Sequence, residues 1–79
     1  MSPTVKREGK YRFFFNSREE TRRHVHVATA DGNAKYWLQP RIELATYYNL
    51  SSKELEEIED LVREYANEIT SAWNRHFGQ

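Results

Sequence analysis

The sequence predicts an α+β fold, in which one long C-terminal helix packs on one face of an antiparallel sheet built from hairpins. Three observations indicate this class. Apolar residues recur at three- and four-residue steps through the last third of the chain, as in an amphipathic helix. Apolar and polar residues alternate on both sides of Asp31-Gly32, a dipeptide typical of hairpin turns. Residues 11–15 add an aromatic run that favours another strand, so three or four strands are expected.

The first hairpin is expected around Glu8-Gly9. Residues 4–7 form its first strand, and residues 11–15 form its second strand. Odd and even positions are both apolar at the end of the second strand, so we expect a central strand that is covered on part of both faces. Residues 16–23 then form a polar connection to the next hairpin.

The second hairpin decides which side chains share a face. With Asp31-Gly32 as a two-residue turn, the apolar residues of its strands lie opposite one another on one face, Val27 with Tyr36 and Val25 with Leu38. The other face then carries His24, His26, Lys35, Trp37 and Gln39, with His26 directly across from Trp37. This second face is expected to be exposed, because a one-residue slip of the register would bury the histidines and the lysine.

The second half of the chain is expected to be helical. Pro40 ends the fourth strand, and residues 41–48 form either a short helix ending at Asn49 or an edge strand; we favour the helix. The long helix begins with a capping box, in which Ser51 and Glu54 each accept a hydrogen bond from the backbone amide of the other. Its apolar stripe consists of Leu55, Ile58, Leu61, Val62, Tyr65, Ile69, Ala72, Trp73 and Phe77.

Length and composition limit the architecture and the chemistry. The chain has 79 residues and no internal repeat, so residues 1–79 are expected to form a single domain. It has no cysteine, which excludes disulfides, thiolate zinc sites and a cysteine nucleophile. The N-terminus does not resemble a signal peptide, and no apolar stretch is long enough to cross a membrane. We therefore expect a cytoplasmic protein without membrane contact.

The charges are balanced in number but are distributed unevenly. Twelve basic residues offset twelve acidic residues, yet residues 5–23 are mainly basic and residues 53–68 are mainly acidic. Such asymmetry can mark a surface that meets nucleic acid on one side of the molecule. It can equally mark a sheet and a helix whose exposed sides compensate each other, and we favour this second interpretation.

Five features follow one another along most of the chain. They are the aromatic run of residues 11–15, the His24-Val25-His26-Val27 alternation, the Ala34-Lys35-Tyr36-Trp37-Leu38 strand, the Leu50-Ser51 start of the helix, and Trp73. In this order and spacing they resemble the small bacterial family known as domain of unknown function 4160. That family commonly has prolines before the first histidine, where this chain has Arg22 and Arg23. The resemblance implies a two-gene, toxin–antitoxin-like pair with a second small protein encoded nearby, and it implies no catalytic residues.

The His24 and His26 pair suggests a metal site first. Residues two apart on a strand lie roughly 6.5–7 Å from each other and point the same way, so both imidazoles can reach one ion. A stable zinc site needs a third or fourth ligand. The candidate His76 belongs to a helix that is expected on the opposite side of the sheet, so we expect no metal.

Metal-independent cleavage of RNA is a second possibility for the same residues. This reaction requires a base, an acid and cations around the phosphate. The candidates for catalysis are His24, His26 and Lys35, with Arg22 and Arg23 near the phosphate and Trp37 stacking on a base. Strand alternation without any activity also explains the same polar residues, and we favour this interpretation over cleavage.

Large aromatic side chains on an exposed sheet face favour a binding role, because such side chains usually find a partner. Trp37 and Phe14 are expected there. Together with the bacterial two-protein pair that the family resemblance implies, this predicts a small interaction module without a cofactor that binds a protein, RNA or DNA; a homo-oligomer is a further possibility. The predicted binding residues are Arg22, Arg23, His24, His26, Lys35 and Trp37, and the alternative is a metal-independent ribonuclease-type toxin.

Overall fold

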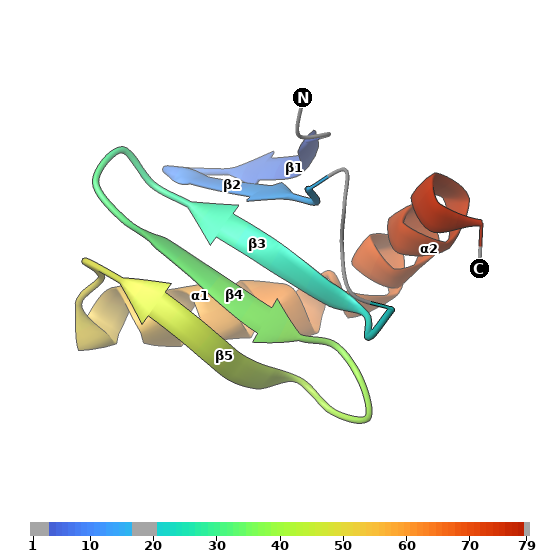
Figure 1. Cartoon of the computed structure of the whole chain (residues 1–79). Coiled ribbons are helices and arrows are strands. Elements are labelled where there is room, and N and C mark those ends of the chain that lie inside the picture. The colour runs from blue at the N-terminus through green and yellow to red at the C-terminus, as the bar shows by residue number, and fades with distance from the viewer. Residues whose placement is uncertain (1–3, 17–20, 79) are drawn as a thin grey trace.

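The computed structural model describes residues 4–16 and 21–78, which contain five strands and two helices (Figure 1). The strands are β1 (Thr4–Glu8), β2 (Tyr11–Phe14), β3 (His24–Ala28), β4 (Asn33–Trp37) and β5 (Glu43–Tyr48). The helices are α1 (Ser52–Glu64) and α2 (Ala66–Phe77). Each strand pairs antiparallel with the next, giving the order β1-β2-β3-β4-β5. The α+β class is thus confirmed, but the sheet is larger than the three or four strands expected.

The first hairpin is confirmed, because β1 and β2 pair around Gly9 as predicted. The predicted pairing of the second hairpin is wrong by two residues: Val25 lies opposite Tyr36, not Leu38, and His26 lies opposite Lys35, not Trp37. A shift of two residues leaves every side chain on its predicted face, because side chains alternate with a period of two.

The turn between β3 and β4 explains this shift. Its central residues are Ala30 and Asp31, since the Thr29 amide donates to the Gly32 carbonyl at 2.9 Å and the Gly32 amide donates to Thr29 Oγ1 at 2.9 Å. Gly32 is required here by its surroundings. A Cβ at this position would lie 2.5 Å from the carbonyl oxygen of Tyr48. The turn therefore packs backbone against backbone on the connection between β5 and α1.

The helix predicted for residues 41–48 is wrong, because residues Glu43–Tyr48 form the edge strand β5. Its register with β4 pairs Lys35 with Thr46 and Tyr36 with Leu44, with a bulge between these two pairs. The strand contains leucine, threonine and two tyrosines, and three of these four are β-branched or aromatic residues that favour strands. Pairing also satisfies backbone groups along the outer side of β4, which a short helix would leave exposed.

The predicted long helix is interrupted at Tyr65. Its start is confirmed, since the Ser51 hydroxyl accepts from the Glu54 amide at 3.0 Å and the Glu54 carboxylate accepts from the Ser51 amide at 2.8 Å. Two hydrogen bonds, one from the Lys10 ammonium and one from the Ser51 amide, lower the pKa of Glu54 to about 2. Tyr65 departs from helical geometry, with φ −103° and ψ 15°, and its hydroxyl donates to Glu8 at 3.0 Å. The change of direction there allows α2 to reach the end of the sheet (Figure 1).

The core lies between the sheet and the helices. Its buried side chains are Tyr11, Phe13, Phe15, Val25, Val27, Ala34, Tyr36, Ile58, Val62, Ile69 and Trp73. The predicted apolar face of the second hairpin is confirmed, with Leu38 packed at the margin of this cluster. Tyr36 also fastens the sheet to α1, because its hydroxyl donates to the Leu55 carbonyl at 3.1 Å. In the described part of the chain, neither helix has the length and apolar content needed to cross a bilayer.

The close approach at Gly32 generates a first prediction. Gly32→Ala should lower the free energy of unfolding by about 1–3 kcal/mol, because the new methyl group meets backbone oxygens that cannot move away easily. The comparison variant is Gly9→Ala, where φ is +58° but no atom lies within 4 Å of the new Cβ; its cost of roughly 1–2 kcal/mol comes from backbone conformation alone.

Urea denaturation followed by circular dichroism measures both variants. Since the Gly32 contact is steric, Gly32→Ser and Gly32→Val should become progressively less stable than Gly32→Ala. A series in which Val at position 32 is as stable as the parent would show that the turn does not pack on the β5–α1 connection.

Candidate functional site

The sheet has two faces, and of the described elements α1 lies over one of them (Figure 1). Register pairs across the central strands place a set of polar and aromatic side chains on the other face. We call this surface the open face. The open face includes Arg12, Phe14, Arg22, His26, Lys35, Trp37 and Tyr48, of which Tyr48 is exposed and the others are half-buried.

Cations and rings contact one another on the open face. The Arg22 guanidinium lies 4.0 Å from the centroid of the Trp37 ring, and Lys35 Nζ lies 4.5 Å from the same centroid. The Arg12 guanidinium lies 4.5 Å from the centroid of Phe14. Such contacts contribute about 0.5–1 kcal/mol each at exposed sites. The contacts hold the long basic side chains over flat rings, so this surface presents positive charge and aromatic area together.

His24 lies on the same side of the sheet as His26 and Trp37, as the alternation predicts, but it is covered and is not part of the exposed surface. Its side chain is fully buried (0% exposed), which contradicts the expected exposure. The imidazole centroid lies 5.0 Å from the Trp73 ring and 5.6 Å from the Trp37 ring, and Nδ1 lies 2.7 Å from the Arg22 carbonyl oxygen. The cause is α2, whose Trp73 contacts both His24 and Phe15 at the end of the sheet.

Arg23 is also removed from the predicted site. Its Nε donates to Asn74 on α2 at 3.1 Å, and its Nη1 donates to the Gln39 side chain at 2.7 Å. Arg22, in contrast, donates to the Gln39 carbonyl at 2.9 Å while lying over Trp37. Of the six predicted binding residues, the structure therefore brings together Arg22, His26, Lys35 and Trp37. It assigns Arg23 and His24 to packing between the sheet and α2.

Two residues of the open face were not recognised from the sequence, Arg12 and Tyr48. Arg12 lies between Tyr11 and Phe13, which are both buried, so its place on the opposite face was readable from the alternation. Tyr48 had no such signal as long as residues 41–48 were expected to be helical. Its alternation with Tyr47 becomes informative only once β5 is a strand.

The two-histidine ribonuclease mechanism is not favoured by this geometry. An acid and a base must both reach the substrate, whereas His24 lies under Trp37 and Trp73. A metal centre has no support either: within residues 4–16 and 21–78, no three potential ligands gather closely enough to hold an ion.

A hollow of about 360 Å³ lies at the turn end of the open face. Its lining residues are Phe14, His26, Ala28, Thr29, Ala30, Asp31, Gly32, Asn33 and Tyr48. Phe14 and His26 stack on each other, with ring centroids 5.3 Å apart and planes 24° apart. The Asn16 side-chain amide nitrogen lies 3.2 Å from His26 Nε2 and helps to orient the ring. The hollow is thus bounded by flat rings and by the polar backbone of the turn.

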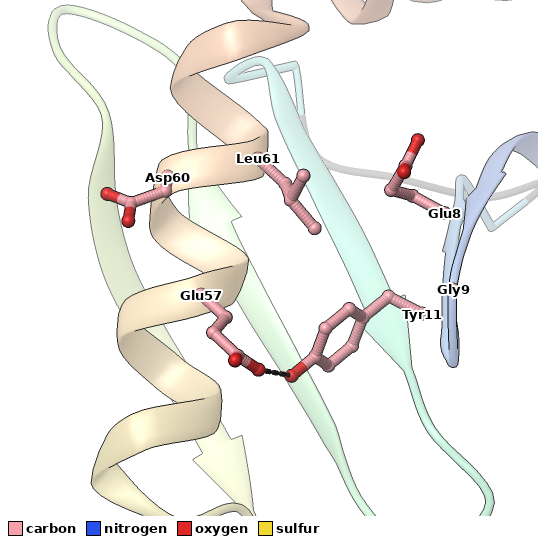
Figure 2. A pocket seen from close by; sticks show the side chains of 6 residues that line it. All are labelled: Glu8, Gly9, Tyr11, Glu57, Asp60 and Leu61. Carbon is pink, nitrogen blue, oxygen red and sulfur yellow. Dashed lines mark hydrogen bonds between the residues drawn. The ribbon is translucent and has the colours of Figure 1, made fainter.

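A second hollow, of about 370 Å³, lies between the first hairpin and α1 (Figure 2). It is lined by Glu8, Gly9, Tyr11, Glu57, Asp60 and Leu61. Figure 2 shows Tyr11 pointing toward Glu57, to which its hydroxyl donates at 2.6 Å. Burial, with a further contribution from Glu57, raises the pKa of Tyr11 well above its ordinary value. Of the three carboxylates that line this second hollow, Glu57 accepts from the Tyr11 hydroxyl and Glu8 accepts from the Tyr65 hydroxyl. These bonds join the first hairpin to the helical region, which indicates a structural role.

Comparison with known proteins adds one match. The model of the family described as "Domain of unknown function (DUF4160)" matches residues 10–74. The matched segment begins just before β2 and ends within α2, so it includes every residue of the open face. The search of curated proteins and the search of solved structures both give no match.

The different positions of the two histidines give a prediction. His24→Ala should lower the free energy of unfolding by about 2–4 kcal/mol, because it removes a buried ring from contact with Trp73 and Trp37. His26→Ala should cost about 1 kcal/mol, because it removes one stacking contact at a half-buried position. Chemical denaturation of both variants gives the comparison. Equal losses would contradict the burial of His24 by α2.

Proposed function

The chain belongs to the family described as "Domain of unknown function (DUF4160)", and from this premise we propose that it is an interaction module that binds a polyanionic partner through the open face. The observation that carries the proposal is the combination of Arg12, Arg22 and Lys35 with aromatic rings on one side of the sheet. A surface of this composition attracts negative charge and offers flat apolar area for contact.

The distribution of charge supports this proposal. Exposed acidic residues lie along α1 on the other side of the molecule, and they are Glu56, Glu57, Asp60 and Glu64. Two other carboxylates of the helices do have basic partners, since Lys6 lies 3.6 Å from Glu68 and Lys10 lies 2.8 Å from Glu54. These pairs sit beside the first hairpin. On the open face, Arg12, Arg22 and Lys35 lie over rings, and Arg22 also lies 3.9 Å from Glu43.

A cation over a ring keeps its full charge, because the attraction comes from the ring quadrupole. The positive charge of Arg22 and Lys35 therefore attracts phosphate, sulfate or carboxylate groups of a partner. Binding of this kind weakens as salt concentration rises.

The protein half of the proposal comes from the family resemblance. We propose that the second small protein encoded nearby forms a toxin–antitoxin-like pair with this chain. Trp37 is the contact residue that we assign to this pair, because a large aromatic side chain that is half-buried in the isolated chain gains most from further burial.

Heparin-affinity chromatography tests the polyanion proposal with a defined probe. The parent protein should be retained, and Lys35→Gln should elute at lower salt because it loses one cation of the open face; each lost contact lowers the salt slope of binding by about 1. The matched control is Lys53→Gln, which removes the same charge from an exposed position on α1. Equal elution of the two variants would contradict binding through the open face.

Expression of the chain with and without the neighbouring protein tests the pair in the same set of variants. Co-purification that is lost in Trp37→Ala and kept in Lys53→Gln supports the assignment. If the parent protein does not co-purify with its neighbour, the proposed pair is refuted. The proposal of polyanion binding is then tested by the heparin result alone.

A further inference from the structure

We infer that the hollow at the turn end of the open face is a binding site for one unstacked nucleobase of a single-stranded nucleic acid. This inference rests on the proposed function, because it names the class of polyanion that the open face binds. The hollow is defined by Phe14 and His26 on one side and by Tyr48 of β5 on the other.

The shape of the hollow follows from side-chain size. Ala28 and Asn33 lie opposite each other in the register, at the point where β3 and β4 enter their turn. The next residue toward the turn on β4 is Gly32, which has no side chain. Small residues between larger rings leave a depression in the sheet surface. Its volume of about 360 Å³ is at the lower end of the range of about 300–1,000 Å³ for ligand sites, so it suits one planar ring system better than a large cofactor.

The walls of the hollow suit a base. Phe14 and His26 form a stacked pair at 5.3 Å, and Tyr48 is 67% exposed, so its ring can move to close over a bound group. Stacking of a base on an aromatic side chain contributes about 1–3 kcal/mol and tolerates any base. The turn adds polar atoms around the rim, including the amide side chain of Asn33, which can bind the edge of a base.

The charges beside the hollow suit the phosphates of the same strand. The Arg12 guanidinium lies over the Phe14 ring at 4.5 Å, and Lys35 lies opposite His26 in the register. A base in the hollow therefore has the Arg12 guanidinium beside one of its aromatic neighbours, and the Lys35 ammonium lies further along the same face, over Trp37. Both cations attract the phosphates of a bound strand. An acidic peptide would also bind the cations, but its charged side chains contain no ring that would stack on the aromatic walls.

A duplex does not fit this arrangement, because its bases are stacked on one another and paired at their edges. A base that enters the hollow must already be unstacked, as in a single strand or a loop. The site is thus expected to select single strands over duplexes of the same sequence, and to do so through the rings and not through the charges.

A pair of oligonucleotides tests the inference. One is a fluorescein-labelled strand of about eight thymidines, a usual length for single-strand sites, and the other has the same phosphates but abasic residues throughout. Fluorescence anisotropy should show the thymidine strand binding roughly tenfold more tightly than the abasic strand, which is the effect of one stacked base. Equal affinity of the two strands would overturn the base site.

Neighbouring tyrosines provide the variant and its control. Tyr47 and Tyr48 are both exposed, at 55% and 67%, but only Tyr48 lines the hollow. Tyr48→Ala should reduce thymidine binding to the abasic level, whereas Tyr47→Ala should leave it unchanged. Both positions are exposed, so neither change is expected to unfold the chain.

The result separates the base site from the proposed function. Retention on heparin together with equal thymidine and abasic binding would refute the base site and keep the polyanion proposal. Loss of heparin retention in the parent would refute both. Tyr48→Ala that abolishes binding of the neighbouring protein, with no preference for thymidine, would assign the hollow to a protein side chain instead of a base.

Discussion

Packing of Val25 and Val27 against α1 is the contact on which the rest of the molecule depends. Both valines are fully buried in one cluster with Ile58 and Val62, and burial of each contributes about 1.5–3 kcal/mol. A one-residue slip of β3 would expose both valines and push His26 into the core, where a polar group without a partner costs further free energy. The register is therefore fixed, and it sets the direction of the side chains in β3 and in the strands on either side.

The helix α2 covers one end of the other face and leaves the opposite end open. Near the start of β3, Trp73 of α2 reaches past the end of the sheet and buries His24. At the opposite end of β3, beside the turn, the hollow is bounded by Phe14, His26 and Tyr48. One imidazole of the pair is thus packed beneath α2 and the other lines the hollow, so the shared sequence motif does not imply a shared environment.

Alternation along the strands made much of this readable from the sequence. The faces of His26, Lys35 and Trp37, the first hairpin and the capping box followed from local patterns that do not depend on distant contacts. The position of the β3–β4 turn did not follow from local patterns. Gly32 is required there because its backbone approaches the β5–α1 connection, and not because of its own backbone conformation. The burial of His24 also escaped prediction, since it depends on the change of direction at Tyr65, and no local signal in the helical stripe marks that residue.

Solvent accessibility of side chains in solution tests the division of the sheet most directly. A soluble paramagnetic agent added to an isotope-labelled sample should strongly broaden the NMR signals of the His26 and Trp37 rings. It should leave the signals of the Val25 and Val27 methyl groups and of the His24 ring sharp. Equal broadening of His24 and His26, or stronger broadening of the valines than of His26, would contradict the assignment of one buried and one open face.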